Sequence, residues 1–125
     1  MQEKAGRTYD LEERLLQFST SIVKLVEELP NTRAGNHVAN QLLRSGTSPY
    51  ANHAEAQAAE SRSDFIHKLR ICLKELRETK RWIMLIQRAA LARQAERVND
   101  LLLECEELIK IFMQSNRTAE SKRKK

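Results

Sequence analysis

Apolar side chains recur at alternating spacings of three and four residues, which is the period of one face of an α-helix. Two stretches keep this spacing without a break. The first contains Leu11, Leu15, Phe18, Ile22, Leu25 and Leu29, and the last contains Leu91, Ala95, Val98, Leu102, Cys105, Ile109 and Phe112. Nowhere do apolar and polar residues alternate as in a half-buried strand. The spacing therefore predicts an all-α fold in which each helix buries one side.

Breaks in this pattern divide the chain into helices. We expect them at Tyr9–Leu29 (N-cap Asp10 or Thr8), Gly35–Glu60, Asp64–Arg88 (N-cap Ser63) and from Leu91 to about Asn116. Pro30 ends the first, because the residue before a proline avoids helical geometry. Long helices with short connections favour an antiparallel up-down-up-down four-helix bundle, which we place at residues 1–116.

The second predicted helix contains Pro49 and can be interpreted in two ways. The segment Ser45–Pro49 can be a loop between two short helices, or Pro49 can bend one continuous helix. We favour the kinked helix, because the alanine-rich stretch Tyr50–Glu60 prefers helix. Its many small residues would let another helix approach closely, within the bundle or across a subunit boundary.

Other features of the sequence indicate the cellular compartment of the protein. No apolar run approaches the roughly 18–20 residues that cross a membrane, and the first residues have no apolar signal-peptide region, so we expect a cytoplasmic protein. Cys72 and Cys105 fall on the apolar sides of different helices. Since packed helix axes lie too far apart for most disulfides, we predict two reduced core cysteines.

The outward side of the third predicted helix carries bases and no acid. Its positions are His67, Arg70, Lys74, Arg77, Arg81, Met84 and Arg88. Like charges three or four residues apart on a helix repel each other, which suggests a negatively charged partner. Glu78 can soften the repulsion by pairing with Lys74 or Arg81. A predicted disordered tail, residues 117–125, adds five bases against one acid to a chain of net charge +5.

Two function classes fit this pattern. Phosphates of RNA or DNA would be bound without sequence reading by the helix and tail bases. These bases are Arg70, Lys74, Arg77, Arg81, Arg88, Lys122, Arg123, Lys124 and Lys125. The alternative is a protein-binding scaffold or adaptor whose basic face docks an acidic protein and no nucleic acid.

The chain lacks the signatures of catalysis. It has no hydrolytic triad, no glycine-rich phosphate loop and no Cys-x-x-Cys pair. Asp64 and His67 have the carboxylate-x-x-His spacing of di-iron bundles, but this spacing occurs once and His67 points outward. We therefore expect no metal, no cofactor and no enzymatic activity.

Apolar residues off the buried sides point to self-association. They are Ile66, Leu73, Trp82, Leu85, Leu101, Leu103 and Met113, which exceed the need of one bundle core. Asn52, after the proline, can satisfy the backbone group that Pro49 frees or make a contact between subunits. Glu55 needs a basic partner if it is buried.

One segment resembles a known family. Arg44-Ser45, Ser48–Ala56, Asp64-Phe65 and Leu69 are similar to the motif of the bacterial four helix bundle proteins, whose members include proteins encoded in intervening sequences of large-subunit ribosomal RNA genes. The accessory variability proteins of diversity-generating retroelements share that fold. The likeness covers about residues 8–113 and assigns motif or structural roles to Arg44, Pro49, Asn52, Glu55, Asp64 and Phe65. The chain departs at His53, Ala56 and the place of Pro49.

The resemblance also implies an oligomer number and a further partner, which the residues alone do not indicate. It implies a homo-oligomeric ring, a pentamer, with a positive surface and nucleic-acid binding. The retroelement branch implies a further partner, a reverse transcriptase with its RNA.

Overall fold

The structure, a computed structural model, describes residues 3–124, with side chains from Leu11 to Lys122. The helices are α1 (Glu3–Glu28), α2 (Arg33–Gln57), α3 (Arg62–Ala89) and α4 (Ala95–Lys124). No strand occurs within the described residues. The prediction of an all-α chain with four helices is confirmed.

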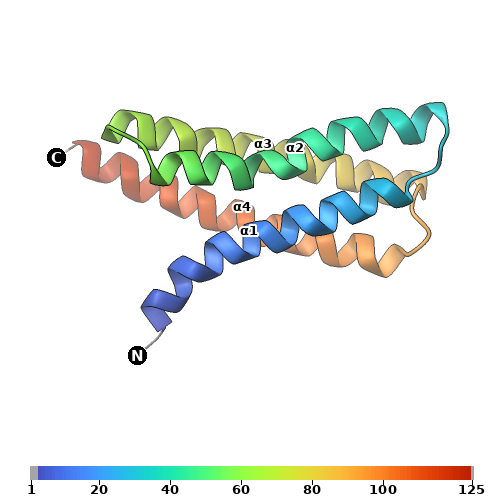
Figure 1. Cartoon of the computed structure of the whole chain (residues 1–125), viewed down its shortest axis with the longest axis horizontal. Helices are drawn as coiled ribbons and strands as arrows, with labels where there is room; N and C mark the ends of the chain where they lie inside the picture. Colours follow the sequence, from blue (N-terminus) through green and yellow to red (C-terminus); the bar gives the residue numbers. More distant parts are fainter. Residues whose placement is uncertain (1–2, 125) are drawn as a thin grey trace.

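Consecutive helices run antiparallel and lie side by side (Figure 1). α2 packs against both α1 and α3, and α3 also packs against α4. α1 and α4 contact each other least, and α1 diverges from α4 toward its N-terminus (Figure 1). The order is up-down-up-down, with both termini at one end and α3 having a neighbour on each flank.

All four helices contribute to one core. Its largest fully buried side chains are Leu15, Phe18, Ile22, Leu25, Leu42, Ile66, Leu76, Thr79, Ile83, Ile86, Leu108 and Phe112. In α4, Leu101 and Leu108 are buried while Leu102 and Ile109 are half-buried. The apolar face of α4 is therefore wider than the predicted single row, and it buries part of the apolar surplus.

The helix starts differ from the predicted caps. α1 begins at Glu3, before Thr8 and Asp10. Ser61, not Ser63, caps α3, since its Oγ accepts a hydrogen bond from the Asp64 amide at 3.1 Å. This leaves Asp64 in the first turn, where a carboxylate interacts well with the helix dipole.

α2 is a single helix that continues through Pro49, so the loop interpretation of Ser45–Pro49 is wrong. The small residues bring neighbouring helices close. A Cβ at Gly46 would lie 2.7 Å from Cγ2 of Ile22 in α1. On the other flank, the Thr79 hydroxyl donates to the Ser45 Oγ at 2.9 Å. α2 thus packs tightly between α1 and α3.

α4 extends to Lys124, and this differs from the predicted disordered tail. Ala119 is only 4% exposed and belongs to the core, so the helix remains attached beyond residue 116. Glu120 forms an ion pair with Arg70 of α3. Lys125 and the side chains of Arg123 and Lys124 lie outside the described residues and side chains.

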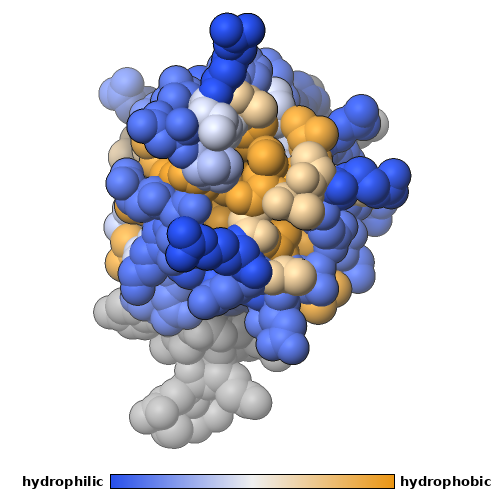
Figure 2. Space-filling view, turned by 90° about the vertical axis from the view of Figure 1, so that its right-hand side faces the viewer, coloured by the Kyte–Doolittle hydropathy of each residue, from blue (hydrophilic) through white to orange (hydrophobic). Residues whose placement is uncertain are grey.

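The end of the molecule that carries both the α1–α2 and α3–α4 connections has an apolar centre with a hydrophilic rim (Figure 2). Leu29 is buried there, and Leu91 and Ala92 pack on the core. Cys72 and Cys105 are free and buried, as predicted. No described helix is both long enough and apolar enough to span a membrane.

Candidate nucleic-acid interface

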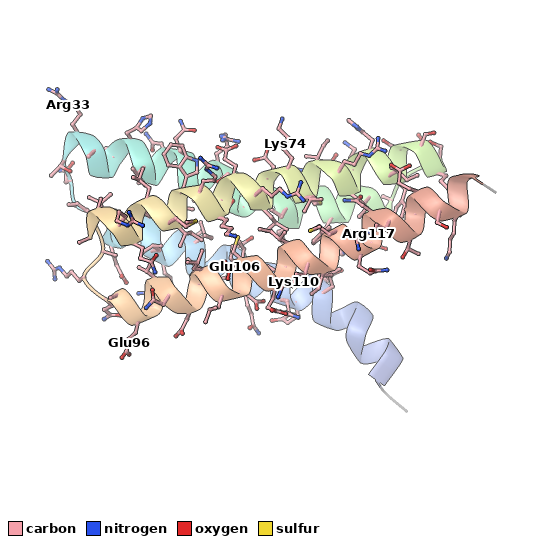
Figure 3. The ribbon with its side chains drawn as sticks, turned by 180° about the vertical axis from the view of Figure 1, so that it is seen from behind. Arg33, Lys74, Glu96, Glu106, Lys110 and Arg117 are labelled. Atoms are coloured by element: carbon pink, nitrogen blue, oxygen red, sulfur yellow. The ribbon has the colours of Figure 1, made fainter. Side chains whose placement is uncertain are left out.

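The helical period places the predicted basic residues of α3 together on the surface. His67, Arg70, Lys74, Arg77, Arg81, Met84 and Arg88 are all exposed. Lys74 projects away from the bundle (Figure 3). We call the five bases Arg70, Lys74, Arg77, Arg81 and Arg88 the α3 basic stripe. Its predicted outward orientation is confirmed.

Most of the stripe forms no ion pair with the described residues of the chain. Arg70 pairs with Glu120 of α4. Within the described part of the chain, the other four stripe residues form no ion pair. Lys122 is exposed near the end of α4. The stripe therefore keeps its positive charge on the surface.

Two acids of α3, Glu75 and Glu78, pair with α2 and not with the stripe. Arg44 of α2 donates one hydrogen bond to Glu75 at 3.1 Å and another to Glu78. The predicted pairing of Glu78 with Lys74 or Arg81 is therefore wrong, because Arg44 reaches the carboxylate from the neighbouring helix. On the other flank, Lys80 pairs with Glu106 of α4 at 3.3 Å, and Figure 3 shows Glu106 pointing toward α3.

Of two motif residues in α2, Asn52 bonds within its own helix and Glu55 joins α2 to α3. Asn52 donates to the Ser48 carbonyl at 3.0 Å and to its Oγ at 2.8 Å. The carbonyl that Pro49 frees is that of Ser45, so Asn52 bonds one turn away from it, and the alternative contact between subunits stays a prediction. Glu55 pairs with Lys68 of α3, and this hydrogen bond raises the Lys68 pKa.

Other motif residues and cysteines face the core. Pro49 is buried, and its carbonyl accepts a contact from Cys72 Sγ at 3.6 Å. Phe65 is half-buried against the core. Burial raises the pKa values of Cys72 and Cys105 to about 12 each, which keeps both as unreactive thiols.

His53 replaces an apolar residue of the motif and is 5% exposed. Its Nε2 lies 3.2 Å from Gln57 Nε2, and its ring meets Phe112 edge-on at a centroid distance of 6.2 Å. Burial lowers the His53 pKa, and the negative charge of Glu12 opposes that shift. A cavity of about 320 Å³ lies beside this ring, with Phe65 and Lys122 in its lining.

A second feature of α3 was not predicted as a site. A groove of about 710 Å³ is lined by Arg77, Glu78, Arg81, Trp82 and Leu85. Trp82 Nε1 donates to Glu78 Oε2 at 3.0 Å, and the ring meets His37 edge-on at 5.8 Å. The sequence placed Trp82 directly after Arg81, which could have indicated such a groove, but we interpreted Trp82 as surplus apolar surface.

Between α1 and α4 lies a third hollow, of about 430 Å³. Arg14 and Glu104 bridge it with hydrogen bonds of 3.0 and 2.8 Å, and Arg97 pairs with Glu28. Within the residues described, no cluster of three or more His, Cys, Asp or Glu side chains is placed to hold a metal ion. His67 is exposed and Asp64 is at the helix start.

Comparison with known proteins places this architecture in a family. A family model described as 23S rRNA-intervening sequence protein matches residues 7–114. A crystal structure of a protein of unknown function from the S23 ribosomal protein family of Bacteroides thetaiotaomicron is 37% identical, with a TM-score of 0.76 over 84% of this chain and 96% of that one. No curated protein matches the chain. The family match covers most of the chain and all four helices, and the chain therefore belongs to the 23S rRNA-intervening sequence protein family.

Proposed function

We propose that this chain is a non-enzymatic, homo-oligomeric protein that binds RNA or DNA through its phosphates. The observation that supports this most is the α3 basic stripe, in which Lys74, Arg77, Arg81 and Arg88 are exposed and unpaired among the described residues. Arg44 supports the stripe indirectly, since it takes the two glutamates that could have neutralised it. Phosphate contacts of this kind position a polyanion without reading its bases.

Self-association would repeat the stripe. Large apolar side chains remain exposed on every helix. They are Leu16, Val23, Leu43, Met84, Leu85 and Leu103, with exposed fractions from 40% to 61%. The resemblance to the four helix bundle proteins supports a pentameric ring, and a bend of α2 at Pro49 would shape its subunit. In a ring, weak phosphate contacts of each subunit would add through effective concentration.

The description of the family suggests which nucleic acid to test first. Its description ties its members to 23S rRNA genes, so RNA is the first ligand to test. The resemblance to the retroelement accessory proteins adds a reverse transcriptase with its RNA as a second proposed partner of the same basic surface. Both proposed roles, RNA binding and association with a reverse transcriptase, would place the protein in the cytoplasm.

The test replaces Arg70, Lys74, Arg77 and Arg81 together by Gln. The matched control replaces four exposed bases on other faces, Lys24, Arg33, Arg93 and Lys110, so that both variants lose the same charge. In a fluorescence polarisation titration with a labelled RNA, the stripe variant should bind at least about tenfold more weakly than the control. Circular dichroism and light scattering should show unchanged helicity and oligomer size. Equal binding by the two variants would reject the proposed site.

The adaptor alternative predicts a different result. A protein partner bound to the stripe would stay attached in a pull-down from nuclease-treated lysate, and purified RNA would not compete for it. A partner joined through RNA would be lost on nuclease treatment.

A further inference from the structure

The groove next to the α3 basic stripe is lined by an aromatic side chain, Trp82, and by two cations of the stripe. Trp82 is half-buried on the core, so part of its ring remains open to the groove. Leu85, one turn on, is 44% exposed and extends the apolar floor. Arg77 and Arg81 line the same groove and belong to the stripe. A flat apolar surface bordered by two cations suits a planar group attached to an anion.

Hydrogen bonds fix the orientation of the indole. Its Nε1 donates to Glu78 Oε2 at 3.0 Å, and that carboxylate also accepts a hydrogen bond from Arg44. His37 of α2 supports the ring at an interplanar angle of 76°. Arg44 pairs with Glu78, the one acid that lines the groove, and offsets part of its repulsion of a phosphate. The ring is thus held in place before any ligand arrives, which lowers the entropic cost of binding.

We propose that the groove holds an unpaired nucleobase stacked on Trp82, with Arg77 and Arg81 binding the adjoining phosphates. This rests on the proposed nucleic-acid binding and narrows it to single-stranded segments. Stacking on an aromatic side chain is a sequence-tolerant way to bind single strands. Bases within a duplex are already stacked on each other and cannot reach the groove without unpairing.

A second copy of the chain is the competing occupant. An apolar face of a subunit would cover Trp82 and Leu85 but would bury Arg77 and Arg81 without a partner. Burying an unpaired charge is strongly unfavourable. A nucleotide covers the ring and neutralises both arginines at once, so the charge pattern favours it.

The experiment exploits Trp82 as the single tryptophan of the chain. Full-length protein is titrated with a labelled single-stranded RNA of 12 nucleotides and with the same RNA as a duplex. Variants are Trp82→Leu, which removes the aromatic ring, and Trp82→Phe, which keeps one. Thr20→Ala is the control, since Thr20 is exposed on α1 and lies outside the groove. Light scattering of each variant reports the oligomer size.

We expect single strands to quench the tryptophan emission of the wild type, while duplex leaves it unchanged. Trp82→Leu should weaken single-strand binding by about tenfold or more, with duplex binding and oligomer size preserved. Trp82→Phe should retain most of the affinity, and Thr20→Ala should retain all of it.

The contrary outcomes separate the two proposals. If the wild type binds RNA but Trp82→Leu binds single strands equally well, the base site is refuted and the stripe proposal stands. If the wild type binds neither RNA, both proposals fail. A change of oligomer size in Trp82→Leu would assign the groove to a second copy and overturn the base site.

Discussion

His53 is an ionisable side chain in a position where the family motif has an apolar one. It is buried against Phe112, and Gln57 provides a neutral polar partner. Burial disfavours the imidazolium and lowers the pKa of His53 below its ordinary value of 6.5. The folded chain therefore binds a proton at this site less readily than the unfolded chain does.

This difference predicts a pH-dependent stability. Above about pH 6.5 His53 is neutral in both states, and its full contribution to folding is present. As the pH falls below that value the unfolded state takes up the proton first, so the free energy of unfolding decreases, by at most about 1.4 kcal/mol per pH unit. Urea unfolding between pH 8 and 5.5, at fixed protein concentration, should show this slope in the wild type.

His53→Leu is the comparison variant. It removes the buried titrating group and keeps His37 and His67, which are exposed. Its unfolding free energy should depend less on pH over the same interval. Parallel pH profiles for the two proteins would show that His53 does not titrate differently in the folded state.

Single-residue roles were predictable from sequence where they depend on one helix alone. The period of α3 was enough to place Arg70, Lys74 and Arg77 outward. The partners of Arg44 could not be predicted in the same way, because they depend on how α2 and α3 align along their axes. That alignment is set by packing between helices, for which spacing along the sequence carries no information.

At the level of helices, α3 ends at the one non-glycine residue with a positive φ among the described residues. Ala90 has φ 52° and ψ 45°, the left-handed conformation that terminates many helices. An L-residue with a Cβ pays roughly 1–2 kcal/mol there, whereas glycine does not. Ala90 is exposed, so its methyl group contributes little packing.

We predict that Ala90→Gly raises the free energy of unfolding by about 0.5–1 kcal/mol, after part of the gain is lost to the greater freedom of glycine in the unfolded chain. Ala89→Gly is the matched control, because the preceding residue is exposed and helical. That change should lower the stability by a similar amount. Urea midpoints that move in the same direction for both variants would contradict the backbone argument.

Helix existence was predictable and helix ends were not. The apolar spacing and its breaks identified four helices, and the alanine-rich stretch after Pro49 favoured one continuous second helix. Ser61 and Ser63 are both acceptable caps by composition, and only the three-dimensional course of the chain chooses Ser61. The end of α4 depends on Ala119, whose small side chain gives a weak periodic signal but finds a buried place.

At the scale of the whole molecule, charge is segregated. α3 presents bases outward, whereas Arg44 of α2 pairs with two of its three acids, Glu75 and Glu78. Across the bundle, α1 and α4 are joined by Arg14–Glu104 and Arg97–Glu28. Ion pairs within the chain thus engage these acidic residues and leave most of the α3 basic stripe unpaired among the described residues, which is the charge pattern that the proposed binding of a polyanion requires.

The Trp82 groove shows why the site was predicted only in part. The stripe is a property of one helix and was visible in the sequence. The groove needs Arg44 and His37 from α2 to hold Glu78 and Trp82 in place. In the sequence, a tryptophan next to an arginine is interpreted as surplus apolar surface until these partners are known.

The salt dependence of RNA affinity tests the central claim most directly, because each phosphate contact releases counterions. Affinity is measured for a single-stranded RNA over about 50–250 mM salt. The wild type and the Lys24, Arg33, Arg93, Lys110→Gln control should both lose affinity steeply as salt rises. For the Arg70, Lys74, Arg77, Arg81→Gln variant, the log–log slope should flatten by about 0.7 for each lost phosphate contact. The same steep slope in all three proteins would contradict binding of nucleic acid by the α3 basic stripe.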